Sequence, residues 1–381
     1  MEFGWNENQK VIWNETYDFA RQKLIKNLQE RDHQGIFLEE NWQAIAAQKI
    51  LGMYLPKKYG GLHYDMVTTI HAMEALGYGC PDNGLTLAVN GQMWAVQEPI
   101  YQFGTEEQKQ KYLPRLIDGT LKGAHGMTEP DAGSDAFNLS TTATKTEGGY
   151  ILNGSKMFIG LGPIADVILA FATVNPSLGR WGVTAFIVDA DSDGVTLGPA
   201  QSKMGLRTGL MGNLEFDDVF VPQANLLGKE GSGASIFTAS MDYERSFIFA
   251  SHVGSMARQL DETIAYANQR KQGGHSIGKY QAVSHRIADM KIRLETARHF
   301  MYKCAWMIDQ GKKIPMEAAM AKLTISELFV ENSMDAIRVH GGRGYLTEFG
   351  LERDLRDALG GVLYSGTSDI QRNLIAGLLG L

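Results

Sequence analysis

Hydrophobic and polar positions divide the chain into three stretches of different periodicity. From residue 1 to about 120, apolar residues recur at helical spacing and strand-like alternation is scarce. From 121 to 228, short apolar runs between turn residues predict strands, most clearly at 167–174 and 183–188. From 229 to 381 the helical pattern returns. We therefore expect an α+β fold with a helical N-terminal domain (1–120), a middle β-domain (121–228) and a C-terminal four-helix bundle (229–381).

Local patterns make these expectations specific. Between residues 283 and 308, apolar positions step alternately by four and three, which predicts one long helix with a bundle-type seam. In the middle stretch, Glu-Gly-Gly at 147–149 predicts a hairpin turn, and Asn-Gly at 153–154 predicts a second tight turn. Pro222 is expected to end the last strand.

Composition narrows the class of protein. The 381 residues are ample for two or three domains, and 44% hydrophobic with 21% charged residues is typical of a soluble globular protein. A net charge of −7 argues against nucleic acid as a partner, although a local basic cluster could still hold an anionic ligand.

Cysteine usage and the N-terminus bear on the compartment. Cys80 and Cys304 are the two cysteines, and their separation fits neither a disulfide framework nor a metal site, so we expect core thiols and no metal. The N-terminus lacks the pattern of a signal or transit peptide. Since no apolar run approaches the roughly 20 residues needed to cross a bilayer, we expect a cytoplasmic protein without membrane association.

Five segments carry residues suited to cofactor chemistry. They are Met-Thr-Glu-Pro-Asp-Ala-Gly-Ser-Asp at 127–135, Lys-Met-Phe-Ile-Gly at 156–160, Arg-Lys-Gln at 270–272 with Gln281, Arg-Val-His-Gly-Gly-Arg-Gly at 338–344, and Tyr-Ser-Gly-Thr-Ser-Asp-Ile-Gln at 364–371. In this order they resemble the acyl-CoA dehydrogenase superfamily over essentially the whole chain. The resemblance implies an enzyme with noncovalently bound FAD that is shared between the subunits of a homotetramer.

The same resemblance indicates which residues contact FAD. They are His125, Met127, Thr128, Gly133, Ser134, Phe158, Ile159, Gly160, Arg270, Gln281, Arg338, Gly341, Gly342, Thr367 and Asp369. Phe158 stands where the family usually has Trp, and Gly160 replaces a hydroxyl residue that bonds flavin N5. Acyl-CoA oxidases of the superfamily also have glycine there, which favours an oxidase that uses molecular oxygen.

The catalytic base has moved in this sequence. Many members of the family carry Tyr-Glu-Gly-Thr-Ser with Glu as the base, whereas Ser365 stands here and a hydroxyl cannot remove a carbon-bound proton unaided. In the isovaleryl-CoA and long-chain branches the base lies on the helix that resembles residues 241–246, which indicates Glu244. Its apolar helix neighbours would desolvate it and make it a stronger base. The alternative is a first-turn Glu that stabilises a helix N-terminus.

The resemblance also implies the substrate contacts. The backbone N–H of Ser365 would bind the thioester carbonyl, and the pantetheine arm would be contacted by Ser134, Asp242, Tyr243 and Arg245. Glu244 would then remove the α-proton while hydride passes to the flavin.

Glu244 combined with Gly160 is similar to the prolyl-acyl-carrier-protein oxidases of antibiotic and cyanotoxin pathways, as in anatoxin-a biosynthesis. We therefore expect oxidation of L-prolyl-acyl carrier protein to a pyrroline or pyrrole thioester. Two alternatives stay open. One is a short- or branched-chain acyl-CoA dehydrogenase that uses an electron-transfer flavoprotein. The other is a catalytically silent scaffold relative.

Overall fold

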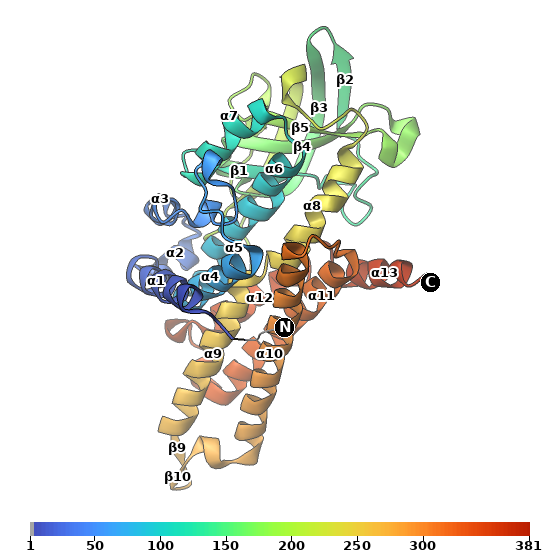
Figure 1. Cartoon of the computed structure of the whole chain (residues 1–381). Helices are drawn as coiled ribbons and strands as arrows, with labels where there is room; N and C mark the ends of the chain where they lie inside the picture. Colours follow the sequence, from blue (N-terminus) through green and yellow to red (C-terminus); the bar gives the residue numbers. More distant parts are fainter. Residues whose placement is uncertain (1–3) are drawn as a thin grey trace.

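The computed structural model describes residues 4–381, which form a helical part, a β-sheet and a second helical part in chain order (Figure 1). The first part consists of α1 (Glu7–Lys23), α2 (Leu28–Gln34), α3 (Glu39–Ala47), α4 (Met66–Gly79), α5 (Asn83–Gly91), α6 (Glu98–Phe103) and α7 (Glu106–Ile117). A π-helical turn, η3 (Gln92–Gln97), joins α5 to α6, and this buried segment packs against the first helix of the C-terminal part.

The sheet contains β1 (Gly123–Gly126), β2 (Thr142–Thr146), β3 (Gly149–Gly160), β4 (Val167–Thr173), β5 (Val183–Asp189), β6 (Val195–Leu197), β7 (Met211–Pro222) and β8 (Leu226–Leu227). The strand order is β6-β7-β3-β2-β4-β5-β8, and β1 pairs in parallel with β4. The apolar runs predicted as strands are β4 and β5, which are buried almost throughout. Because β1 and β2 both adjoin β4, the loop between them stays close to the sheet.

One predicted turn is wrong. The hairpin at 147–149 is confirmed, since Thr146 pairs with Gly149 and Gly148 adopts a φ of 78°. Residues 153–154, however, lie inside β3, where a register shift against β7 marks a β-bulge. At Gly154 φ is 145°, and a Cβ would lie 2.7 Å from Thr141 Cα. The Asn-Gly pair therefore serves a bulge rather than a turn, because β7 pairs with both halves of the strand.

The C-terminal part is the predicted bundle. It contains α8 (Gly233–Phe247), α9 (Ala250–Gln269), α10 (Gln281–Asp309), α11 (Pro315–His340), α12 (Leu351–Gly361) and α13 (Ser368–Leu378), with the β9–β10 hairpin (Lys271–Gln272 and His275–Ser276) between α9 and α10. The α10 seam is buried from Met290 to Cys304, but Val283 and Ile287 are only half-buried. Both belong to the first two turns of α10, and this end of the helix follows the β9–β10 hairpin, which lies at the free end of the bundle away from the sheet (Figure 1).

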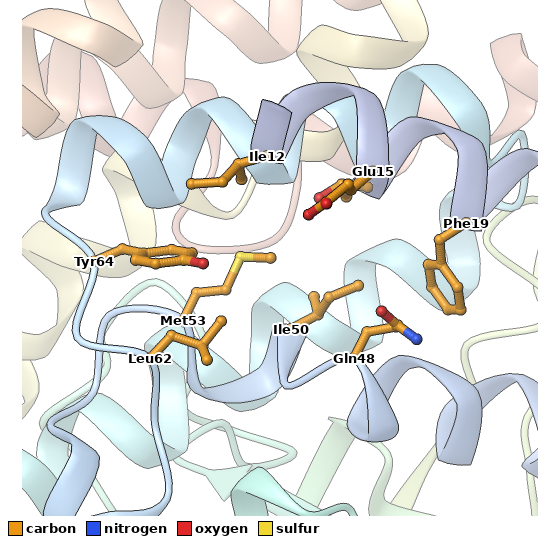
Figure 2. Close-up of a pocket in the computed structure, with 9 residues that line it drawn as sticks. Ile12, Glu15, Phe19, Gln48, Ile50, Met53, Leu62 and Tyr64 are labelled. Carbon is orange, nitrogen blue, oxygen red and sulfur yellow. The ribbon is translucent and has the colours of Figure 1, made fainter. Parts of the chain in front are cut away.

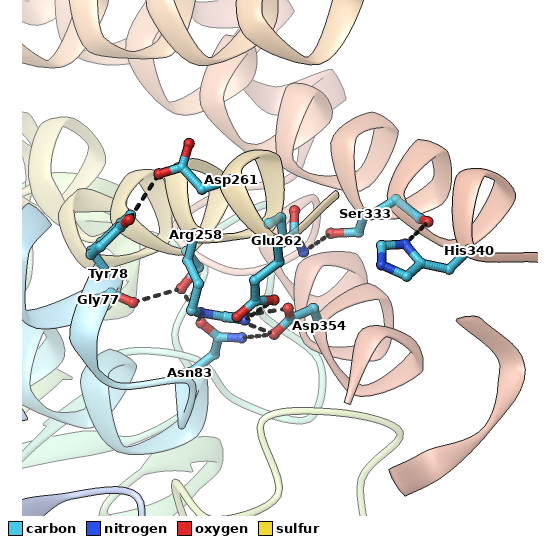
Figure 3. Close-up of polar contacts among 12 residues, drawn as sticks. Gly77, Tyr78, Asn83, Arg258, Asp261, Glu262, Ser333, His340 and Asp354 are labelled. Carbon is cyan, nitrogen blue, oxygen red and sulfur yellow. Dashed lines mark hydrogen bonds and ion pairs between the residues drawn. The ribbon is translucent and has the colours of Figure 1, made fainter. Parts of the chain in front are cut away.

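A buried polar network joins the first part to the bundle (Figure 3). Asn83 on α5 donates to Asp354 and Asp357 on α12, each at 3.1 Å. Arg258 on α9 pairs with Asp354 at 3.0 Å. Because Asn83, Asp354 and Asp357 are buried, each depends on its partner, and the network fixes α5 and the following η3 against the bundle.

Between α1 and the segment 48–64, the first part leaves a small pocket of about 70 Å³ (Figure 2). Its lining mixes apolar side chains such as Ile12 and Met53 with Glu15 and Gln48. Ligand sites are typically about 300–1,000 Å³, so this pocket is too small for a nucleotide cofactor. Within residues 4–381, no helix is both long enough and apolar enough to cross a bilayer, and no cluster of side chains suits a metal ion.

Candidate active site

The structure brings Ser365 and Glu244 into direct contact. Ser365 Oγ donates a hydrogen bond to Glu244 Oε1 at 2.5 Å, although the two residues are 121 positions apart in sequence. The residue that stands at the usual base position thus binds the carboxylate that the sequence analysis identified as its replacement. This contact defines the centre of the candidate site.

Glu244 lies in the last turn of α8, so its interpretation as a first-turn residue is wrong. The carboxylate faces the negative end of the helix dipole, which opposes ionisation. Burial raises the pKa of Glu244, whereas the Ser365 hydroxyl and the charges of Arg245 and Lys322 lower it, and the net direction is upward. A carboxylate with a raised pKa is a stronger base when ionised.

Lys322 on α11 was missed in the sequence analysis. Its side chain is fully buried, and Nζ has no hydrogen-bond partner among residues 4–381. Burial lowers the pKa of Lys322 to about 8, against the opposing effect of the nearby acidic residues. Arg245 Nε is likewise buried without a partner. The available signal was a single lysine inside the apolar run Ala-Ala-Met-Ala-Lys-Leu at 318–323.

The loop that carries Ser365 is held in a defined conformation. Ser365 adopts a φ of 56°, a left-handed value that is uncommon for a residue with a side chain. Gln371 Nε2 donates to the carbonyl oxygens of Ser365 and Gly366 at 3.1 and 3.0 Å. Thr367 caps α13 by accepting from Ile370 N. Gln371 therefore positions the loop, a role that sequence reasoning did not assign.

Two of the predicted FAD segments meet in the sheet domain. Met157 N donates to Thr128 O at 2.9 Å, which joins segment 127–135 to segment 156–160. Beneath this junction, Lys156 Nζ pairs with Glu129 Oε1 at 2.7 Å, and both side chains are fully excluded from solvent. Burial alone would raise the pKa of Glu129, but Lys156 and the donors of residues 140 and 141 lower it, and the lowering prevails. The pair fixes both segments to the sheet.

The groups near this junction fit a planar ring with a polar edge. Phe158 is 58% exposed and, like Ser365, has a positive φ. A Cβ added at Gly160 or Gly133 would meet no atom within 4 Å, so there is open space beside both. His125 Nε2 is buried without a partner in the described part of the chain, while Ile159 is buried in the sheet domain.

Five other predicted FAD residues form a second cluster. Arg270 and Gln281 flank the β9–β10 hairpin, and Arg338, Gly341 and Gly342 lie at the end of α11. Tyr266 links them, because Arg270 N donates to its carbonyl and its ring stacks on His340 at 4.2 Å. Open space surrounds Gly341 and Gly342. This end of the bundle is remote from the sheet (Figure 1), so one chain does not bring the two clusters together.

The remaining predicted residues divide between three places. Thr367 and Asp369 follow Ser365 directly. Ser134 is exposed on the β1–β2 loop, and Asp242 and Arg245 flank Glu244 on α8, where burial raises the pKa of Asp242 to about 6. Tyr243 instead lines a separate pocket with Glu98 and Tyr101. Consecutive residues on a helix point about 100° apart, so Tyr243 is not directed to the Glu244–Ser365 pair.

Comparisons with known proteins agree with this architecture. The family models for the N-terminal, middle and C-terminal domains of acyl-CoA dehydrogenase match residues 6–120, 124–219 and 231–379. An L-prolyl-(peptidyl-carrier protein) dehydrogenase of Pseudomonas fluorescens is 43% identical over 377 residues, covering 99% of each chain. A protein of the same name from a Serratia species is 40% identical over 381 residues, covering 100% of this chain and 99% of its own.

Solved structures give the same result. The prolyl acyl carrier protein oxidase AnaB superposes with a TM-score of 0.98 at 46% identity, covering 99% of this chain and 100% of its own. PigA, solved with FAD and proline, superposes with a TM-score of 0.97 at 40% identity over 100% of both chains. With three family models in order and relatives above 40% identity along its whole length, this chain belongs to the acyl-CoA dehydrogenase family.

Proposed function

We propose that the protein is an FAD-dependent enzyme that oxidises an L-prolyl thioester on a carrier protein to the pyrroline or pyrrole thioester. The hydrogen bond between Ser365 and Glu244 carries this proposal, because it provides a carboxylate base where the usual one is missing. The names of the relatives from Pseudomonas fluorescens and Serratia, together with AnaB and PigA, support the prolyl substrate.

We propose the following roles for residues of the chain in this reaction. Glu244 accepts the proton from the carbon α to the thioester carbonyl, and Arg245 and Lys322 favour its ionised form. The backbone N–H of Ser365, on the loop that Gln371 positions, binds the carbonyl oxygen as negative charge develops there. Asp242, Arg245 and Ser134 are proposed to hold the pantetheine arm. FAD, when bound, supplies a two-electron acceptor, which suffices once for the pyrroline and is needed twice, with reoxidation in between, for the pyrrole.

The cofactor residues imply more than one subunit. We propose that the junction of residues 127–135 and 156–160 binds FAD on one chain, while Arg270, Gln281 and residues 338–342 of another chain complete the site. Large apolar side chains are exposed near the second cluster and the C-terminus, as at a subunit interface. They are Ile292, Tyr345, Leu346, Leu363, Leu378, Leu379 and Leu381. A homotetramer would satisfy both observations.

The first test is anaerobic mixing of the FAD-loaded protein with prolyl-carrier protein, and separately with branched and straight acyl-CoA, while the visible flavin band is followed. Bleaching by prolyl-carrier protein alone, with colour restored by air, is the expected result and identifies an oxidase. Bleaching by an acyl-CoA alone that persists in air would overturn the proposal in favour of a dehydrogenase that uses an electron-transfer flavoprotein. A lack of bleaching with every thioester would favour the silent relative.

Replacing Ser365 by Ala should shift the pH dependence of flavin bleaching to higher pH. The Ser365 hydroxyl lowers the pKa of Glu244, so its loss raises that pKa and leaves less ionised base at low pH. We expect a several-fold slower reaction below the pKa and little change well above it, measured by stopped-flow absorbance. Ser368→Ala is the matched control, since the Ser368 hydroxyl is buried without a partner. An equal loss at all pH values would show that Ser365 acts through loop geometry instead.

Replacing Lys322 by Met should shift the same profile upward and also stabilise the fold. Removing the cation raises the pKa of Glu244, while a buried ammonium without an acceptor destabilises the native state by more than the about 1–3 kcal/mol that an unsatisfied neutral group costs. Thermal unfolding and the pH profile measure the two effects. Lys313→Met, at an exposed lysine, should change neither. A less stable variant with an unshifted profile would contradict this electrostatic role.

A further inference from the structure

A second pocket lies on another side of α8 from Glu244, and nothing in the proposed reaction uses it. Its volume is about 240 Å³, it opens to solvent, and it is lined by residues of α4, α6, α8 and α10 together with the segment before α4. Neither Glu244 nor Ser365 lines it. Among residues 4–381, its lining contains several tyrosines and carboxylates and the exposed His63, but no lysine or arginine.

Glu98 at the start of α6 is the unusual group in this pocket. It is 1% exposed, and its Oε1 accepts from Gln102 Nε2 at 2.8 Å, whereas Oε2 is buried without any partner among residues 4–381. Burial raises the pKa of Glu98 to about 7, against the lowering effect of Gln102 and of the nearby Tyr54 hydroxyl, which itself donates to Met93 O at 3.2 Å. Burying a carboxylate without a cation destabilises the folded protein. A bound cation would remove this cost at Glu98.

The other two carboxylates of the pocket are already compensated. Asp65 accepts from Thr68 N at 2.7 Å, and Asp309 accepts from the backbone N–H groups of Met66 and Val67 at 2.7 and 3.0 Å. Both therefore cap the N-terminus of α4, where the helix dipole stabilises negative charge. Because η3 continues directly into α6, there is no free helix N-terminus at Glu98, and no backbone N–H among residues 4–381 donates to it. Glu98 is therefore the carboxylate that remains open to a ligand.

Three phenol rings surround this carboxylate. Tyr54, Tyr101 and Tyr243 line the pocket, and in each of them burial first and the charge of Glu98 second raise the phenol pKa. Aromatic faces attract cations, most strongly where water is excluded. A metal ion does not fit, because no set of three suitable side chains gathers anywhere in residues 4–381.

We propose that this pocket binds a small alkylammonium ion, with its charged nitrogen donating to Glu98 Oε2 and lying among Tyr54, Tyr101 and Tyr243. The carboxylate provides the acceptor and the opposite charge, and the rings provide contact with the alkyl groups. The site is independent of the proposed reaction, although it shares α8 with Glu244.

Isothermal titration calorimetry of the FAD-loaded protein with propylammonium chloride, in an amine-free phosphate buffer, tests the proposal. The neutral probe is 1-propanol, which has the same number of heavy atoms. We expect saturable binding of propylammonium alone, weakened about tenfold or more by Glu98→Gln and also weakened by Tyr101→Leu. Glu147→Gln removes an exposed carboxylate of the hairpin turn and should leave the affinity unchanged.

Several outcomes would overturn the proposal. Equal binding of both probes would show that charge is not recognised, and unchanged affinity in Glu98→Gln would show that this carboxylate is not the acceptor. Binding that is lost in Glu244→Gln but kept in Glu98→Gln would place the ion at the active site. If Glu98→Gln does not fold, the comparison of the two probes and the Tyr101→Leu variant still decides the result.

Discussion

Replacing Glu244 by Gln is expected to slow the bleaching of the flavin by prolyl-carrier protein by about 10²–10⁴-fold, the usual contribution of a general base. The amide keeps the shape of the side chain and can still accept the hydrogen bond of Ser365, but it cannot take up a proton. Stopped-flow absorbance measures the rate, and the intensity of the visible spectrum shows that the cofactor is retained.

Two further variants make this result specific. Glu262→Gln alters an exposed carboxylate on α9 that pairs with Arg258, and it should leave the rate unchanged. Adding Ser365→Glu to the Glu244→Gln variant returns a carboxylate to the position the wider family uses and should restore part of the rate. Glu244→Gln protein that bleaches at the original rate would exclude Glu244 as the base and reopen the scaffold interpretation.

The largest expected effect on stability comes from the buried ion pair of the sheet domain. Lys156→Met leaves the Glu129 carboxylate without its cation in a site with no solvent access, and losing one partner of a buried pair typically costs about 3–5 kcal/mol. We expect the variant to unfold at a much lower urea concentration, and circular dichroism measures this unfolding midpoint. Weaker FAD retention should accompany it, because the pair supports the junction at Thr128 and Met157.

The controls separate the pair from its surroundings. Lys145→Met breaks an exposed pair with Glu230 on the same sheet and should cost less than about 1 kcal/mol. The double variant Lys156→Met, Glu129→Leu removes both buried charges and should recover much of the lost stability. A double variant as unstable as the single one would show that Glu129 acts chiefly through its hydrogen bonds to Ser140 and Thr141.

Periodicity located the elements because it depends only on which faces are buried. It predicted α10 and the central strands β4 and β5 correctly, whereas it misjudged Gly154, since Asn-Gly is equally suited to a turn and to a bulge. The choice depended on β7, a strand almost 60 residues further along the chain. Local pattern carries no information on such pairing.

In the candidate site, too, local sequence predicted some features, whereas others depended on tertiary packing. Glu244 could be predicted because the motif at 364–371 lacks a base, but the direction of the Ser365 hydroxyl exists only once α8 and the loop before α13 meet. Lys322 and Glu98 received no role in the sequence analysis. Lys322 is buried because α11 packs on α8, and Glu98 is buried because α6 also packs on α8. These contacts are tertiary and cannot be obtained from local sequence.

The distance between the two groups of cofactor residues has a thermodynamic consequence. If one FAD bridges two chains, flavin binding and subunit association are linked, and each strengthens the other by the same free energy. Dilution would then release flavin, and excess flavin would oppose dissociation. Neither dissociation constant would have a single value of its own, since each would depend on the concentration of the other component.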